Sequence, residues 1–369
     1  MNATSRIAPQ PQQSAIAPEP VLAVEGVVKH FGVGSWWLGR MSGSIKAVDG
    51  CSFALARGET LGIVGESGCG KSTLARLLLH LIAPDRGSIS LDGATVGAVD
   101  GLSIRELRRQ VQMVFQDSYA SLNPRHSAAE EVAFGVRAQG IGRAEAMKRA
   151  HRALDLVGLT HELYAHRYPH ELSGGQRQRV NIARALAIEP SVLVLDEAVS
   201  ALDKSVQAQV LNLLVDLKER LGLSYVFISH DLNVVRFISD RVLVMYLGQV
   251  MEIGPVQRVY GAPAHQYTRA LIASRLSVDP RRRVTQPAVL GDPPSPSDPP
   301  PGCRFSTRCS IAEGICGTVE PRLMPASDDA RHLAACHASA PGSGHSRAPA
   351  AAATVEAIHP APGTQADVR

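Results

Sequence analysis

The sequence predicts an α/β fold in which a mainly parallel sheet is covered by helices on both faces. Short apolar runs such as Ser191–Leu195 lack the alternation of a half-buried strand, which is typical of strands buried on both sides. These runs alternate along the chain with longer segments whose apolar residues recur at helical spacing. That order is typical of parallel strands joined by crossover helices.

Turn residues and apolar periodicity place the individual elements. Pro84 closes the first helix, Gly158 ends the second and Pro190 stops the third, because each is unfavourable inside a helix. The expected strands are Thr60–Val64, Ser88–Leu91 with a turn at Asp92–Gly93, Val111–Phe115, Ser191–Leu195 and Tyr225–Ile228, with a hairpin over Val242–Ile253 that turns at Gly248. The expected helices are Lys71–Leu81, Arg143–Leu159, Gln176–Ile188 and Ser205–Leu221.

Composition divides the 369 residues into five segments. Residues 1–20 are rich in Pro, Gln and Ala and are expected to be a disordered leader, whereas residues 21–275 are dense in apolar residues and are expected to form the main domain. Residues 276–301 are expected to be a Pro-rich linker, since seven of the fifteen residues from Pro287 to Pro301 are proline. Residues 302–338 form a Cys-rich segment, and residues 339–369 are expected to be a disordered tail.

Charge and hydropathy exclude several classes of protein. The formal net charge of +4 and the aromatic content of 4% argue against a nucleic-acid partner. No segment approaches the ~18–20 consecutive apolar residues of a membrane span, and the first twenty residues lack the apolar core of a secretory signal. We therefore expect a cytosolic protein that reaches a membrane only through a partner.

A glycine-rich turn between the first expected strand and helix is the strongest local motif. Residues 65–72 fit the pattern G-x-x-x-x-G-K-[ST], in which backbone N–H groups and a helix N-terminus cradle phosphates. Lys71 would contact the β- and γ-phosphates and Ser72 a Mg²⁺ ion. The alternative is a glycine-rich turn with an incidental lysine. The residues expected at the nucleotide are Gly65, Glu66, Ser67, Gly68, Cys69, Gly70, Lys71, Ser72 and Thr73.

Two carboxylates follow the buried run that ends at Leu195. We expect Asp196 to hold the Mg²⁺ shell and Glu197 to orient or deprotonate the attacking water. Two solvated acids at a strand end are the alternative. That alternative loses weight downstream of a complete phosphate loop.

A second anion-binding helix N-terminus is predicted at Leu172–Gln176. Its Ser173 hydroxyl and the backbone of Gly174 and Gly175 stand just before the helix that contains Gln176. With this segment the chain resembles the ATP-binding-cassette (ABC) family over about Val21 to Ser274. The phosphate loop, the signature, the acidic strand end and a following histidine all occur in the family's order.

The resemblance implies a P-loop NTPase core with a parallel sheet, an antiparallel β-subdomain and a helical signature subdomain at about 117–172. It also implies ATP and Mg²⁺ as ligands, with two cassettes meeting head to tail. The signature residues Ser173, Gly174, Gly175 and Gln176 would then act on the nucleotide of the partner subunit, and Asp203 would lie in a loop that crosses the dimer interface.

The remaining family positions fall on three residues of this chain. Gln116 matches the glutamine that contacts Mg²⁺ or water, so that Ser72, Gln116 and Asp196 would together hold Mg²⁺. His230 matches the histidine that contacts the γ-phosphate. Phe31 matches the aromatic that stacks on adenine, although Trp36 and Trp37 lie close by. The resemblance thus implies a catalytic group of four residues: Lys71, Gln116, Glu197 and His230. Many family members carry proline where this chain has Ala198, and we have no physical account of that change.

Several stretches resemble the ATPases of bacterial oligopeptide and dipeptide importers, and the stretch from Gln116 to Arg125 resembles their F-type subunit. The resemblance implies two membrane permease subunits, a second ABC ATPase (a heterodimer rather than a homodimer), an extracytoplasmic solute-binding protein and no nucleic acid. It places the chain at the cytoplasmic face of the bacterial inner membrane. Nickel chelates, glutathione or another small solute are the alternatives to peptide.

Four of the six cysteines lie at Cys303, Cys309, Cys316 and Cys336. Structural zinc sites usually contain a closely spaced cysteine pair, which is missing here, and four thiolates in loops suit an iron–sulfur cluster better. In the resembled subfamily these cysteines bind a [4Fe–4S] cluster. Zinc with His332 or His337 is one alternative, and four unligated thiols are another.

Two other functions remain open from the residues alone. A soluble ABC ATPase acting on nucleic acid or ribosomes usually carries two cassettes or a long coiled-coil insertion, and this chain has neither. A redox or metal sensor that uses the cassette as a scaffold would depend on the cysteine segment.

Overall fold

The computed structural model describes residues 20–35, 40–274 and 291–350. The expected leader therefore lies outside the described residues except for Pro20, which begins the first strand. Trp36, Trp37, most of the expected linker and residues 351–369 also lie outside them.

The larger sheet has eight strands in the described part of the chain. They are β3 (Thr60–Val64), β6 (Val111–Val114), β7 (Val192–Asp196), β8 (Ser224–Ile228), β9 (Arg241–Tyr246), β10 (Gln249–Pro255), β11 (Met324–Pro325) and β12 (Leu333–Ala334). Their spatial order is β11-β12-β10-β9-β3-β8-β7-β6. The five strands from β9 to β6 run parallel, whereas β10, β12 and β11 pair antiparallel at one edge. The predicted parallel sheet is confirmed.

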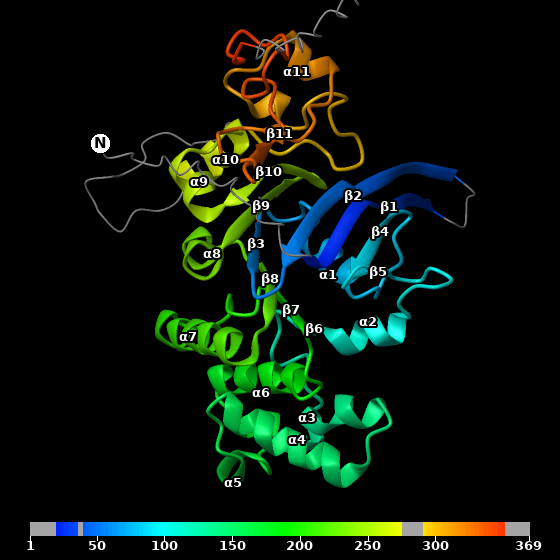
Figure 1. Cartoon of the computed structure of the whole chain (residues 1–369), viewed down its shortest axis with the longest axis vertical. Coiled ribbons are helices and arrows are strands. Elements are labelled where there is room, and N and C mark those ends of the chain that lie inside the picture. The colour runs from blue at the N-terminus through cyan, green and yellow to red at the C-terminus, as the bar shows by residue number, and fades with distance from the viewer. Residues whose placement is uncertain (1–19, 36–39, 275–290, 351–369) are drawn as a thin grey trace, which may run out of the picture.

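A second sheet is wholly antiparallel and lies beside the first (Figure 1). It consists of β1 (Pro20–Ser35), β2 (Arg40–Ala56), β4 (Arg86–Leu91) and β5 (Ala94–Thr95), in the order β2-β1-β4-β5. This sheet is the antiparallel β-subdomain that the resemblance implies.

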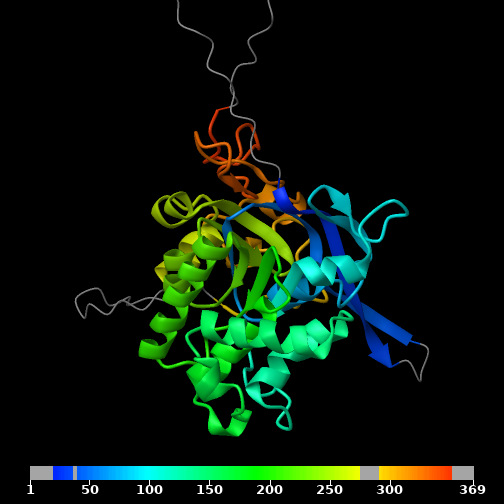
Figure 2. The same cartoon turned by 60° about the horizontal axis from the view of Figure 1, so that its bottom comes forward.

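Helices surround both sheets. They are α1 (Lys71–Leu78), α2 (Ile104–Gln110), α3 (Ala128–Ala138), α4 (Arg143–Leu156), α5 (His161–Tyr164), α6 (Gly174–Leu186), α7 (Lys204–Leu221), α8 (Leu232–Ile238), α9 (Val256–Gly261), α10 (Gln266–Ala273) and α11 (Gly314–Thr318). Helices α3 to α6 gather at the end of the molecule opposite the segment around α11 (Figures 1 and 2). None of the helices in the described ranges combines the length and apolar character needed to cross a bilayer.

The central strands are buried on both faces, as their lack of alternation predicts. On β7, Val192 and Val194 pack into the apolar cluster that contains α1 and the second sheet. Leu193 and Leu195 point the other way, into the cluster formed with α3, α4, α6 and α7. A sheet with two buried faces is typical of parallel α/β folds.

The first helix ends earlier than predicted. It stops at Leu78 instead of Leu81, because His80 adopts a positive φ of 51°. The His80 N–H bonds the carbonyl of Leu77, and the Leu81 N–H bonds that of Arg76. This pair of bonds is a Schellman motif, which ends a helix well before any proline is reached.

The C-terminal segment docks onto the edge of the larger sheet. Strand β12 pairs with β10, with Glu252 opposite Ala334, and β11 pairs with β12. Near this edge the fully buried Glu252 side chain accepts a hydrogen bond from His332 at 2.8 Å. Phe305 is buried against Tyr246 of β9 and Tyr267 of α10.

The expectation of a disordered tail from residue 339 is wrong for residues 339–350. His345 is buried, and its Nε2 lies 3.0 Å from the Ile311 carbonyl oxygen. The Ser346 N–H donates to Glu313 at 3.0 Å. The sequence did not indicate these polar contacts, because the segment has few large side chains and is rich in Ala and Gly. In the expected linker, the carbonyl of Pro296 accepts a hydrogen bond from the Lys46 N–H at 3.3 Å.

Candidate nucleotide-binding site

The phosphate loop joins β3 to α1 and is shaped by close backbone neighbours. Gly70 has a φ of 108°, and a Cβ atom there would lie 2.0 Å from the Ala47 carbonyl oxygen of β2. A Cβ atom at Gly65 would lie 2.2 Å from the Met245 carbonyl oxygen of β9. Only glycine fits at these two positions, so the pattern of the motif follows from the packing of two strands against the loop.

Lys71 is buried and lies across this loop. Its Nζ donates to the carbonyl oxygens of Gly65 at 2.8 Å and Glu66 at 2.9 Å. Cys69 is also buried, and its Sγ lies 3.7 Å from Nζ. The ammonium group is therefore held over a concave loop whose backbone can accommodate phosphate oxygens.

Asp196 and Ser72 face each other at the carboxyl end of β7. The Ser72 hydroxyl lies 3.3 Å from Asp196 Oδ1. Burial raises the pKa of Asp196, although the hydrogen bond from Ser72 opposes this shift. A hydroxyl and a buried carboxylate oxygen are ligands that suit Mg²⁺, whose charge would favour the ionised form of Asp196.

Glu197 contacts two residues, Gln116 and His230, that follow two other strands of the larger sheet. It has a positive φ of 49°, and its N–H bonds the Ile228 carbonyl of β8. Its Oε2 accepts a hydrogen bond from Gln116 Nε2 at 2.9 Å and lies 3.4 Å from His230 Nδ1. A glutamate held in this uncommon backbone conformation is typical of functional sites.

The signature segment forms the beginning of α6. The Ser173 hydroxyl accepts the N–H of Gln176, and the Gln176 side chain accepts the N–H of Ser173, which makes a capping box. A Cβ atom on Gly175 would lie 2.4 Å from Val206 Cγ1, whereas one on Gly174 meets nothing closer than 3.8 Å. Helix packing therefore requires glycine at the second position only.

Asp203 and Phe31 have clear structural places of their own. Asp203 caps α7 by accepting hydrogen bonds from the N–H groups of Ser205 and Val206, and these hydrogen bonds lower the pKa of Asp203.

Phe31 lies on β1 opposite Ile45 of β2. Phe31 is 40% exposed, and Lys29 Nζ lies 5.7 Å from its ring centre. It is thus one strand away from the Ala47 backbone that contacts the phosphate loop.

The four C-terminal cysteines line one small cavity. All are free thiols, and the cavity is shared with His265, His337 and His345. Burial raises the pKa of Cys303 to about 12 and also raises that of Cys309 and Cys336. His332 does not line the cavity, because its ring is bound to Glu252 and Ser327.

Sequence reasoning missed three residues near these sites. The buried His265 accepts the Tyr267 N–H at Nδ1, which places its proton on Nε2, 3.9 Å from Cys303 Sγ. Arg304 and Arg308 of the Cys-rich segment reach Asp49 and Glu66. Arg304 and Arg308 lie in stretches that resemble the importer subfamily, beside Cys303 and Cys309, but neither signal reveals a distant partner.

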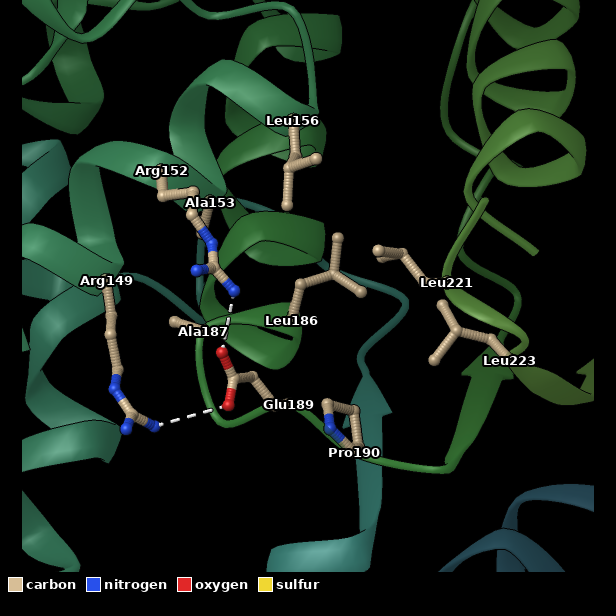
Figure 3. Close-up of a pocket in the computed structure, with 10 residues that line it drawn as sticks. All are labelled: Arg149, Arg152, Ala153, Leu156, Leu186, Ala187, Glu189, Pro190, Leu221 and Leu223. Carbon is tan, nitrogen blue, oxygen red and sulfur yellow. Dashed lines mark hydrogen bonds and ion pairs between the residues drawn. The ribbon is translucent and has the colours of Figure 1, made fainter. Parts of the chain in front are cut away.

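Another pocket lies away from all of these residues (Figure 3). Glu189 accepts from Arg152 at 2.8 Å and pairs with Arg149 at 3.5 Å above an apolar floor. The lining residues are Arg149, Arg152, Ala153, Leu156, Leu186, Ala187, Glu189, Pro190, Leu221 and Leu223. None of them belongs to the nucleotide site.

The comparisons with known proteins agree with this geometry. Residues 48–200 match the ABC transporter family, and residues 251–316 match the oligopeptide/dipeptide transporter C-terminal region. The second match begins inside β10 and ends at the third cysteine of the cavity. The match over residues 48–200 identifies an ATP-hydrolysing ABC cassette.

Relatives match nearly from end to end. A putative peptide import ATP-binding protein of Brucella ovis is 48% identical over 318 residues, which are 86% of this chain and 97% of that protein. The oligopeptide transport ATP-binding protein AppF of Bacillus subtilis is 45% identical, with 88% of this chain and 99% of that protein covered. The chain therefore belongs to the ATP-binding subunits of the oligopeptide/dipeptide ABC importer family.

Solved structures support the same cassette fold. The cbiO1 protein of Clostridium perfringens, part of the ABC transporter complex cbiONQ, is 31% identical with a TM-score of 0.57 over 66% of this chain and 91% of that chain. An ATP-binding cassette solved as a dimer in a post-hydrolysis state with ADP and phosphate is 30% identical with a TM-score of 0.55, covering 64% and 98%.

The two signature glycines should respond differently to substitution. We expect Gly175→Ala to destabilise the chain by about 1–3 kcal/mol through overpacking against Val206, and Gly174→Ala to be nearly neutral. The midpoint of thermal unfolding measures both. Adding Val206→Ala to Gly175→Ala should restore part of the loss. An equal loss for both glycines would contradict this account.

Proposed function

We propose that this ATPase drives the import of oligopeptides or dipeptides as one of the two ATPase subunits of a membrane transporter. The observation that carries the proposal is the union in one chain of an ABC cassette and the peptide-transporter C-terminal region. Relatives at 44–48% identity that are named for peptide, oligopeptide or di/tripeptide transport support it.

In the proposed site, each side chain has a definite role in hydrolysis. The phosphate loop and Lys71 would bind the β- and γ-phosphates, and Ser72, Asp196 and Gln116 would hold Mg²⁺, which would supply positive charge to the phosphate oxygens. Glu197 orients and deprotonates the attacking water, and His230 contacts the γ-phosphate. The contacts of Glu197 with Gln116 and His230 support this assignment.

Two cassettes would meet head to tail, with each nucleotide between one chain's phosphate loop and the other's signature. Ser173, Gly174, Gly175 and Gln176 then act on the nucleotide of the partner, and Asp203 lies at the interface. The dimeric cassette with ADP and phosphate supports such an assembly for a relative. We favour a heterodimer with a second ATPase, because the chain resembles the F-type subunit. Phe31 would stack on adenine.

A wide groove offers a docking place for the permease. Its volume is about 1070 Å³, and it runs from Ser72, Gln116 and Asp196 to the exposed Phe115 and Phe134. In the assembled transporter, the grooves of the two cassettes would pass motion to cytoplasmic helices of two permease subunits, so that Gln116 senses both nucleotide and permease. A solute-binding protein would act outside, and this chain would lie on the cytoplasmic face of the inner membrane.

The cysteine cavity has the chemistry of a metal site, and we propose that it holds a [4Fe–4S] cluster. The backbone N–H groups of Phe305, Ile311 and Ala338 act to lower the pKa values of Cys303, Cys309 and Cys336, each two residues earlier. Such N–H groups stabilise thiolates, which burial alone disfavours. Cys316 completes four ligands, and the cluster would supply the cross-link that this small segment lacks.

Glu197→Gln should slow ATP turnover on the order of 10²–10⁴-fold while ATP still binds, because the amide cannot accept the proton. Phosphate release and ATP affinity measure the two effects. Glu189→Gln is a matched control, since Glu189 also has a positive φ but lies in the distant pocket. An unchanged rate of ATP turnover in Glu197→Gln would show that Glu197 is not the catalytic base.

The ATPase activity of the chain, reconstituted with its permease, second ATPase and binding protein, should rise when short peptides are added. The rate should rise because the peptide-loaded binding protein acts through the permease on the ATPase subunits. Strong basal activity without any response to peptides would shift the solute to a nickel chelate, glutathione or another small solute. Stimulation by nucleic acid instead would favour a soluble ABC ATPase.

Chain purified without oxygen should contain iron and acid-labile sulfide, and Cys316→Ser should lose both. Cys51→Ser is the control, because Cys51 is equally buried but lies outside the cavity. Metal analysis of the folded fraction gives the answer. Zinc in place of iron would support the alternative metal, and an absence of metal in the wild type would leave four unligated thiols.

A further inference from the structure

The Cys-rich segment touches the nucleotide site directly through an arginine. We propose that Arg308 is a positioning residue for the phosphate loop and sets the affinity for ATP by holding the side chain of Glu66. The inference rests on the proposed binding role of residues 65–73. It adds a residue that lies 242 positions further along the chain.

The contact is partly buried, and one guanidinium nitrogen reaches both carboxylate oxygens. Arg308 Nη1 lies 3.1 Å from Glu66 Oε1, 3.0 Å from Glu66 Oε2 and 3.1 Å from the hydroxyl of Tyr246. The Arg308 side chain is 8% exposed, and that of Glu66 is 28% exposed. Such a charge pair is shielded from solvent far more than an ordinary surface ion pair.

Glu66 is bound at each of its polar groups. Its N–H donates to the Tyr267 hydroxyl at 2.9 Å, and its carbonyl oxygen accepts from Lys71 Nζ at 2.9 Å and from the Cys69 N–H at 3.2 Å. A shift of the Glu66 backbone therefore moves a carbonyl that holds the phosphate-binding ammonium. Arg308 acts on Lys71 through this one residue.

Packing alone does not account for an arginine at this place. The Nε of Arg308 is buried and has no hydrogen-bond partner among residues 20–35, 40–274 and 291–350. Burial of a guanidinium with one unsatisfied N–H is costly, and an apolar side chain would fill the same space at less cost. The charged end of Arg308 lies where it meets the phosphate loop.

A second arginine reaches the same loop by another route. Arg304 bonds the Leu247 carbonyl and the Asp49 carboxylate. Gly248, the next residue in that turn, donates its N–H to the Cys69 carbonyl oxygen at 2.9 Å. Arg304 directly follows Cys303, and Arg308 directly precedes Cys309. Both arginines are therefore neighbours of cysteines that line the cavity.

The test uses the full chain and measures Kd for MgATP together with kcat and KM for phosphate release. Arg308→Gln should raise Kd and KM by about fivefold or more, the lower range of coupling between linked sites, with kcat changed much less. Arg308→Lys should recover part of the affinity, because an ammonium group can still pair with Glu66. Arg331→Gln is the control: Arg331 is exposed and pairs with Asp329 inside the segment, so its Kd should match the wild type.

A double-mutant cycle separates positioning from general destabilisation. If Arg308 acts through Glu66, the variant Glu66→Gln/Arg308→Gln should bind ATP no more weakly than Glu66→Gln alone. Effects of the two substitutions that multiply, or an Arg308→Gln chain with wild-type Kd, would overturn the inference. If Arg308→Gln fails to fold, a wild-type Kd for Arg308→Ala overturns it equally. A wild-type chain that binds no ATP would overturn the proposed nucleotide site as well.

Discussion

Parallel pairing of β3, β8, β7 and β6 is the constraint on which the site depends. Parallel strands have their carboxyl ends at one edge, so the residues that follow them meet there without any sequence proximity. The phosphate loop follows β3, Gln116 follows β6, and His230 follows β8. Asp196 is the last residue of β7, and Glu197 comes directly after it. The two buried faces of the sheet hold this edge in register. Two separate hydrogen bonds, from Gln116 to Glu197 and from Ser72 to Asp196, then join residues of neighbouring strand ends.

Much of this arrangement was predictable because it follows from local rules. The limits of β3 and the turn at Gly248 were identified from apolar runs and glycine alone, and both are confirmed. The position of the candidate catalytic group was predicted from the order of motifs in a known family. The end of α1 was not predictable, since a histidine with positive φ carries no compositional signal. Nor was the ordered stretch at 339–350, whose anchors are single polar contacts with residues about 33 positions earlier.

The contacts between the C-terminal segment and the cassette are long-range and therefore invisible to pattern analysis. Arg308 meets Glu66 across 242 positions, and His332 meets Glu252 across 80. Cysteine spacing predicted a site in this segment. It could not predict that a residue between the cysteines would contact the candidate phosphate loop. The segment therefore contacts the candidate nucleotide site and is also a candidate metal module.

The pairing of β12 with β10 also has a consequence for solubility. Without β12, strand β10 would end the larger sheet with unpaired backbone groups at that edge, and exposed edge strands of this kind join the edges of other molecules. Glu252 would at the same time lose the histidine that satisfies it in a fully buried place. The short C-terminal strands thus act as a cover against intermolecular β-association, and a chain shortened to the cassette alone would be prone to aggregate even with an intact catalytic edge.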